Sequence, residues 1–193
     1  MKLSFRSLAA AAFVASATMA APVVSPVAVA IAAENPMVGG APMYANKTIV
    51  ENAVNSKDHT TLVAAVKAAG LVDTLSGKGP FTVFAPTNEA FDMLPKGTVD
   101  TLLKPENKAK LTKVLTAHVV PGKLDAKTLM ADIKKGGGKA KLKTVSGDTL
   151  TAEMKGKKLY IMDESGGMAE VTIANVMQSN GVIHVVNKVL LPK

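Results

Sequence analysis

The first half of the chain carries hydrophobic residues at helical spacing. Leu111, Val114, Leu115 and His118 fall at i, i+3, i+4 and i+7, which predicts an apolar face on a helix that begins at Pro105. The same spacing, bounded by capping residues and by glycine or proline stops, predicts further helical segments over residues 49–54, 60–69, 71–75, 88–94, 98–103 and 124–133. The N-terminal half is therefore expected to be largely helical.

An alternating pattern replaces the helical spacing after the glycine run at residues 136–138. It predicts strands over residues 139–145, 149–154, 158–162 and 169–174, and a last apolar run follows the turn signal Asn180-Gly181. One strand is predicted among the helices, at residues 81–85, which are apolar on both faces and so typical of a strand buried on both sides. Helices first and strands later indicate the α+β class with a mainly antiparallel sheet.

The N-terminus has the pattern of a signal peptide over residues 1–33. Lys2 and Arg6 precede an apolar stretch, and the small residues that follow suit cleavage between about residue 20 and residue 33. The alternative is a membrane anchor, but Pro22 and Pro26 interrupt the run of about 20 apolar residues that a membrane span needs. We therefore expect export to the periplasm or to the outside of the cell.

A single domain is expected to follow the signal peptide. Residues 34–46 contain glycine and proline without a hydrophobic period, which predicts a flexible lead-in. The folded domain is expected over residues 47–193, where the chain shows no internal repeat. A hydrophobic content of 48% supports a sizeable core for a chain of this length.

Two stretches within this domain resemble the two signatures of the fasciclin domain family. Residues 81–91 (FTVFAPTNEAF) resemble the first signature, and residues 179–192 (SNGVIHVVNKVLLP) resemble the second, in place and in order. The resemblance implies one fasciclin-like domain in which N-terminal helices pack on a β-wedge, similar to the small secreted bacterial members. It also places Phe84 and Phe91 in the core.

The resemblance implies a function in adhesion. Fasciclin-type domains are non-enzymatic modules that mediate contact between cells, with the matrix or with a host, so the implied partner is a cell-surface or matrix protein or a polysaccharide. One implied contact element contains a Tyr-His pair, of which this chain keeps the histidine and has Ala117 in place of the tyrosine. The candidate partner-binding residues are His118, Val119, Val120, Asn180, Gly181, Val182, Ile183 and His184.

Positive charge concentrates between the helical half and the sheet. The chain has 23 Lys and Arg against 15 Asp and Glu, a net charge of +8, which falls by two to +6 when Lys2 and Arg6 are removed. Lysines on an exposed strand either keep a sheet edge solvated or attract anionic polysaccharide or the headgroups of an anionic membrane, whereas nucleic acid is not expected as the partner of an exported chain. The candidate anionic-ligand residues are Lys139, Lys141, Lys143, Lys155, Lys157 and Lys158.

The sequence offers little for catalysis. No serine or threonine motif frames the three histidines His59, His118 and His184, and the chain has no cysteine. Neither a metal nor a cofactor is expected, because a His-x-x-x-His pair and a calcium loop are absent. An enzyme or small-ligand carrier on the same fold would need a deep pocket with convergent polar groups. His184 is expected to be a core histidine or a support for a surface loop, and the sequence leaves the oligomeric state open.

Overall fold

Helices occupy most of the chain between residues 49 and 117 in the computed structural model, which describes residues 35–192. They are α1 Ile49–Ala53, α2 Thr60–Ala69, α3 Val72–Ser76, α4 Asn88–Asp92, α5 Thr98–Leu103 and α6 Lys108–Ala117, with 3-10 turns at Lys57–His59 and Pro105–Asn107. Side-chain caps begin two of them, since the Thr48 hydroxyl accepts from Glu51 N and the Thr87 hydroxyl accepts from Ala90 N. Gly70 ends α2 with a left-handed φ of 72°.

The strands form a seven-stranded sheet in the order β4-β3-β9-β8-β7-β6-β5. β3 and β9 pair in parallel, and the other neighbouring pairs are antiparallel, so the predicted α+β class with a mainly antiparallel sheet is confirmed. The strands are β3 Phe81–Pro86, β4 Val119–Pro121, β5 Lys139–Lys143, β6 Thr149–Lys155, β7 Lys158–Met162, β8 Met168–Gln178 and β9 Gly181–Val186.

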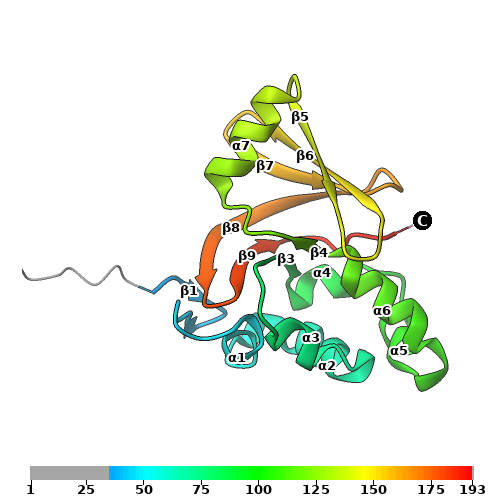
Figure 1. Cartoon of the computed structure of the whole chain (residues 1–193). Helices are drawn as coiled ribbons and strands as arrows, with labels where there is room; N and C mark the ends of the chain where they lie inside the picture. The colour runs from blue at the N-terminus through cyan, green and yellow to red at the C-terminus, as the bar shows by residue number, and fades with distance from the viewer. Residues whose placement is uncertain (1–34, 193) are drawn as a thin grey trace, which may run out of the picture. The chain divides into compact units, whose positions relative to one another are not determined.

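β8 bends where it changes from one partner strand to the other. Its first residues pair with β7 and the remainder pairs with β9, with register shifts on either side of Ile173 and a positive φ of 61° at Asn175. The bend lets the sheet curl, so that Val145 N, just after β5, donates to Val119 O of β4 at 2.8 Å. Figure 1 shows the result, with β5 to β7 and α7 (Ala126–Lys135) on one side of β3 and β9, and α1 to α6 on the other.

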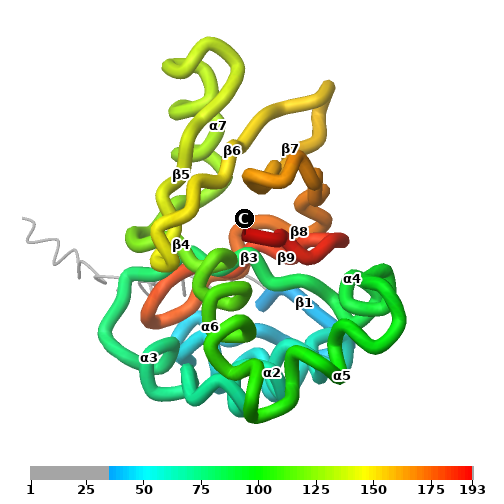
Figure 2. Tube along the Cα trace, turned by 90° about the vertical axis from the view of Figure 1, so that its right-hand side faces the viewer, coloured from blue at the N-terminus to red at the C-terminus, as the bar shows by residue number. Residues whose placement is uncertain are grey.

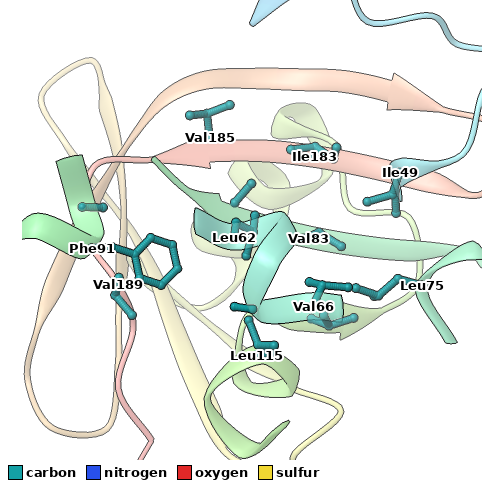
Figure 3. Close-up of a cluster of buried hydrophobic side chains, with 14 of the residues drawn as sticks. Ile49, Leu62, Val66, Leu75, Val83, Phe91, Leu115, Ile183, Val185 and Val189 are labelled. Atoms are coloured by element: carbon teal, nitrogen blue, oxygen red, sulfur yellow. The ribbon is translucent and has the colours of Figure 1, made fainter. Parts of the chain in front are cut away.

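Two hydrophobic cores lie on opposite faces of β3 and β9 because side chains alternate along these strands. Val83 and Ala85 belong to the first core, which side chains of α1, α2, α3 and α6 complete. Figure 3 shows Val83 near Leu62 and Val66 of α2. Phe84 and Val186 point into the second core, which α7 and strands β5 to β7 enclose. Phe84 is 0% exposed and Phe91, in the first core, is 6% exposed, so both predicted core positions are confirmed.

A short hairpin precedes the first helix. Its strands β1 Met37–Val38 and β2 Ala41–Pro42 are joined by Gly39 and Gly40, both with positive φ. The side chains of Val38, Ala41 and Met43 are buried in the first core. Residues 37–43 are therefore packed, unlike the flexible lead-in that the sequence predicts for residues 34–46.

The predicted signal peptide over residues 1–33 lies outside the described residues. Within residues 35–192, no helix combines the length and the apolar character needed to cross a membrane. Figure 2 shows the described part from the side, with α6 between α3 and α5.

Candidate functional site

His118 is a buried hydrogen-bonding residue between α6 and β4. Its Nε2 accepts the backbone N–H of Leu190 at 2.9 Å, so its Nδ1 carries the proton and donates to Val114 O at 2.8 Å. Burial lowers the pKa of His118 to about 4, although the bond to Val114 and the carboxylate of Asp163 act in the opposite direction. The neutral ring therefore ties the segment after β9 to the end of α6.

His184 has an equivalent role at the centre of β9. Its Nε2 lies 2.8 Å from Leu124 O, and its Nδ1 accepts the N–H of Asn175 at 3.4 Å. The ring stacks on Phe84 with a centroid separation of 5.7 Å. Burial lowers the pKa of His184. This residue thus supports both the bend of β8 and the connection that leads into α7.

His59 lies in the helical layer. Its Nδ1 is 2.8 Å from Ser56 Oγ, and its buried Nε2 makes no hydrogen bond of normal geometry. Burial lowers the pKa of His59, against the influence of the nearby Ala85 backbone, which raises it. The hydrogen bonds of all three histidines run to backbone atoms or to a serine, in contrast to the histidine–carboxylate pair that general base catalysis commonly uses.

Most of the candidate partner-binding residues are inside the protein. The exception is Asn180, which is half-buried at the turn between β8 and β9. The buried members are His118, Val119, Val120, Gly181, Val182, Ile183 and His184. A contribution of these buried residues to partner binding would have to act through the surface segments that they hold in place.

Asn180 fixes the β8–β9 turn to the helical layer. Its Oδ1 accepts the N–H of Ile49 at 3.0 Å, and its Nδ2 donates to Leu75 O at 2.7 Å and to Gly77 O at 3.0 Å. The neighbouring Ser179 N donates to Lys47 O at 2.9 Å. The turn is therefore held by four hydrogen bonds to segments that lie more than 100 residues earlier in the chain.

Two glycines allow the turn to approach β3 closely. A Cβ atom on Gly181 would lie 2.0 Å from Phe81 O, and one on Gly79 would lie 2.0 Å from Asn180 O. Glycine in a turn signal such as Asn180-Gly181 commonly supplies a positive φ, but Gly181 is not among the residues of the described chain with positive φ. Lack of space explains the glycine instead.

An open hollow lies beside this turn. We call it the turn hollow and define it by its lining residues 76–80, Lys123 and 178–181, which enclose a volume of about 410 Å³. Lys78 and Lys123 are exposed there, and Gln178 is buried and accepts a hydrogen bond from Asn52. Sequence patterns identify Asn180 but miss the two lysines, because three segments far apart in the chain meet here.

The six candidate anionic-ligand lysines are all exposed, on β5 and around the β6–β7 turn. Three of them are in ion pairs: the Nζ atoms of Lys139 and Lys155 lie 3.5 and 3.4 Å from Glu153, and that of Lys158 lies 2.7 Å from Glu170. The hydrogen bond to Glu170 also raises the pKa of Lys158. The structure therefore places two carboxylates within the lysine cluster and reduces its net charge.

Neither a cluster of metal-binding side chains nor a large cavity in the apolar interior supports a metal or cofactor site in the described part of the chain. Within residues 35–192, no group of three or more His, Asp or Glu side chains is placed to hold a metal ion. An enclosed apolar cavity lies between β3 and the helices, near Leu62, Val66 and Leu115, but its volume is about 40 Å³. Drug-sized ligands occupy pockets of roughly 300–1,000 Å³, so this cavity is too small for them.

Comparison with known proteins gives consistent matches. The model of the Fasciclin domain family matches residues 57–192. Protein sll1483 from Synechocystis sp. is 51% identical over 145 residues, which are 75% of this chain and 73% of that protein. Transforming growth factor-beta-induced protein ig-h3 from Sus scrofa is 36% identical over 145 residues, which cover 75% of this chain and 19% of that longer protein.

A solved structure shares the fold. It is a FAS1 domain pair from the insect cell adhesion molecule Fasciclin I, which superimposes with a TM-score of 0.67 at 18% sequence identity. The match covers 75% of this chain and 51% of that chain. At this identity the match bears on the fold, which agrees with the helical layer and curled sheet described above.

Proposed function

The chain belongs to the fasciclin domain family, and from this premise we propose that it is an exported, non-enzymatic module for adhesion or surface interaction. Its partner would be a protein or a polysaccharide of a cell surface or matrix. The solved FAS1 domain pair with the same fold comes from an insect cell adhesion molecule, which supports this class of function. The predicted signal peptide supports a location in the periplasm or outside the cell.

The observation that carries the proposal is the fixed geometry of the β8–β9 turn. Ser179 is exposed at its tip, while Asn180 beneath it makes three hydrogen bonds to α1 and to the end of α3. A surface that is already rigid loses little conformational entropy when a partner binds, so more of the contact energy remains as affinity. This turn belongs to the segment that the family resemblance implicates in partner contact.

The histidines support a non-enzymatic role. The ring nitrogens of His118 and His184 are engaged in hydrogen bonds that link elements of the fold. Using either ring as a general base would break a bond that holds the C-terminal segment or the β8 bend. Both side chains are also buried, away from a substrate in solution.

Adhesion of the purified protein to cells and matrix of its source organism tests the proposal. We expect Ser179→Tyr, which adds bulk at the exposed turn, to weaken adhesion by about tenfold, which corresponds to a loss of about 1.4 kcal/mol at a contact near the centre of the interface. The matched control is Ser165→Tyr at the exposed β7–β8 turn, which should leave adhesion unchanged. Wild-type protein that adheres to neither cells nor matrix, or a Ser179 variant that adheres as well as wild type, would contradict the proposal.

A second candidate is an electrostatic binder of anionic polysaccharide or lipid that uses the lysine-rich strands. Its support is the exposure of Lys141, Lys143 and Lys157, for which the structure records no ion pair with a described residue. In this case binding would fall steeply with added salt, because exposed charges are screened within about 10 Å at 0.1 M. Charge reversal of Lys139, Lys141 and Lys143 would then abolish adhesion, whereas Ser179→Tyr would not.

A further inference from the structure

We propose that the turn hollow binds a carboxylate group of an acidic polysaccharide, with Lys78 and Lys123 as its cationic ligands. This inference rests on the proposed function and gives the partner a chemical class. The hollow has a volume of about 410 Å³. That volume lies within the roughly 300–1,000 Å³ typical of small-molecule sites and admits one unit of a polymer.

The two lysines reach the hollow from different connections that are bonded to each other. Lys78 lies between α3 and β3, and Lys123 lies between β4 and α7. The backbone N–H of Gly122 donates to Pro80 O at 2.9 Å, which holds these two connections side by side. Both side chains therefore belong to one site although 45 positions separate them in the sequence.

Positive charge in the hollow is not offset by its own lining. No Asp or Glu is among the lining residues, and neither Lys78 nor Lys123 forms an ion pair within 4.0 Å with a residue of the described chain. Asp125, two residues after Lys123, instead caps α7 by accepting the N–H of Thr128 at 2.7 Å. The hollow thus differs from the six lysines on β5 and around the β6–β7 turn, where Glu153 and Glu170 neutralise part of the charge.

The backbone on both sides of the hollow is held before a ligand arrives. The buried Thr82 hydroxyl donates to Gly122 O at 2.6 Å and accepts the N–H of Leu124 at 2.8 Å, so the residues flanking Lys123 are fixed. The Asn180 amide donates to Gly77 O, next to Lys78. Because the backbone at both lysines is already fixed, only their side chains are ordered when a ligand binds, which costs less entropy than ordering lysines on a free loop.

The shape and composition of the hollow favour a carboxylate on a polymer over a lipid headgroup. A concave site admits a single projecting group, whereas a membrane surface is flat and is bound best by a protruding basic surface. The lining also contains no aromatic residue on which a sugar ring could stack, so charge rather than stacking would select the ligand. Lysine binds a carboxylate as a point charge with rotatable donors, which suits groups carried on a flexible chain.

Titration calorimetry with polygalacturonate, and with uncharged dextran as the neutral polymer, tests this assignment. The test variant is Lys78→Gln/Lys123→Gln, and the matched control is Lys141→Gln/Lys143→Gln on β5, which removes the same charge. We expect polygalacturonate to bind wild type and dextran not to bind. The hollow variant should bind about tenfold more weakly and the control within about twofold of wild type, because the ligand interacts with two specific cations. Amide shifts of Gly79 and Ser179 on titration should locate the site in the hollow.

Three results would overturn the assignment. The first is no binding of polygalacturonate by wild type. The second is a loss in the Lys141/Lys143 variant equal to or greater than that in the hollow variant, which would indicate attraction by net charge or a site on β5. The third is binding of anionic lipid vesicles, with loss in the hollow variant, in the absence of polygalacturonate binding. If wild type adheres to cells in a Ser179-dependent manner but ignores polygalacturonate, this inference fails while the proposed adhesion function stands.

Discussion

At the scale of single residues, three buried or half-buried polar side chains fix the geometry of surface segments that are distant in the sequence. His118 holds the segment after β9, Thr82 holds the connection around Lys123, and Asn180 holds the β8–β9 turn. The sequence marks His118 and Asn180 through the family resemblance, but nothing local in it reveals their bonding partners. Leu190, which His118 holds, lies 72 positions away, and the partners of Asn180 lie up to 131 positions away, distances that hydrophobic periodicity cannot report.

The neutral state of His118 predicts a loss of stability in mild acid. Its pKa is about 4 in the folded protein against the usual 6.5, so between these values the unfolded chain binds more protons than the folded one. The contribution is fully present above pH 6.5 and is lost as the pH falls toward 4. We expect the free energy of unfolding in urea to drop by about 2 kcal/mol from this residue between pH 7 and pH 5.

A variant isolates that contribution. His118→Gln has no titrating ring and should lose correspondingly less stability between pH 7 and pH 5 than wild type. His59 and His184 also have lowered pKa values, caused by burial, so their contributions have the same sign and remain in the variant. Wild-type stability that stays constant over this range would show that the ring is not held neutral.

At the scale of elements, the sequence predicts regular segments well and irregular ones poorly. The expected strand at residues 158–162 agrees with β7, and the apolar stretch at residues 81–85 agrees with β3 to within one residue. β8 extends to Gln178 although alternation predicts a strand only to residue 174, because the bend at Asn175 interrupts the period. The β1–β2 hairpin is not predicted from the sequence, because strands of two residues are too short to show an alternation of apolar and polar residues.

β3 contributes to both cores, so its large side chain should be costly to remove. Phe84 is fully buried and stacks on His184 in the second core. We expect Phe84→Ala to lower the free energy of unfolding by about 3–5 kcal/mol, from lost transfer energy and the cavity left behind. Denaturant melts measure the change, and the exposed Met93→Ala is the control that should cost little. A loss below about 1 kcal/mol for Phe84→Ala would contradict its burial.

At the scale of the whole described domain, stability is expected to be uneven. The six residues of β9 are all buried between the two cores, whereas α5 has no fully buried residue. The turn hollow forms where three connections between secondary-structure elements meet. Because these connections are far apart in the chain, the sequence does not reveal the hollow. Surface sites of this kind depend on tertiary contacts that no single segment encodes.

Amide hydrogen exchange should reproduce that unevenness. We expect the amides of β9 and β3 to exchange only when the whole domain unfolds, and those of α5 to exchange through local opening, because few buried contacts hold that helix. Mass spectrometry after deuterium labelling, with peptides that separate residues 98–103 from residues 181–186, measures the difference. Equal protection of the two segments would contradict the expectation.

The parallel pairing of β3 and β9 has a mechanical consequence for the adhesive role proposed above. Six residue pairs join these strands in register, from Phe81 with Gly181 to Pro86 with Val186. A force that pulls the two ends of the described domain apart would act on β3 at its first residue and on β9 at its last residue. In a parallel pair this geometry shears the strands along their length, so the hydrogen bonds share the load instead of opening one at a time.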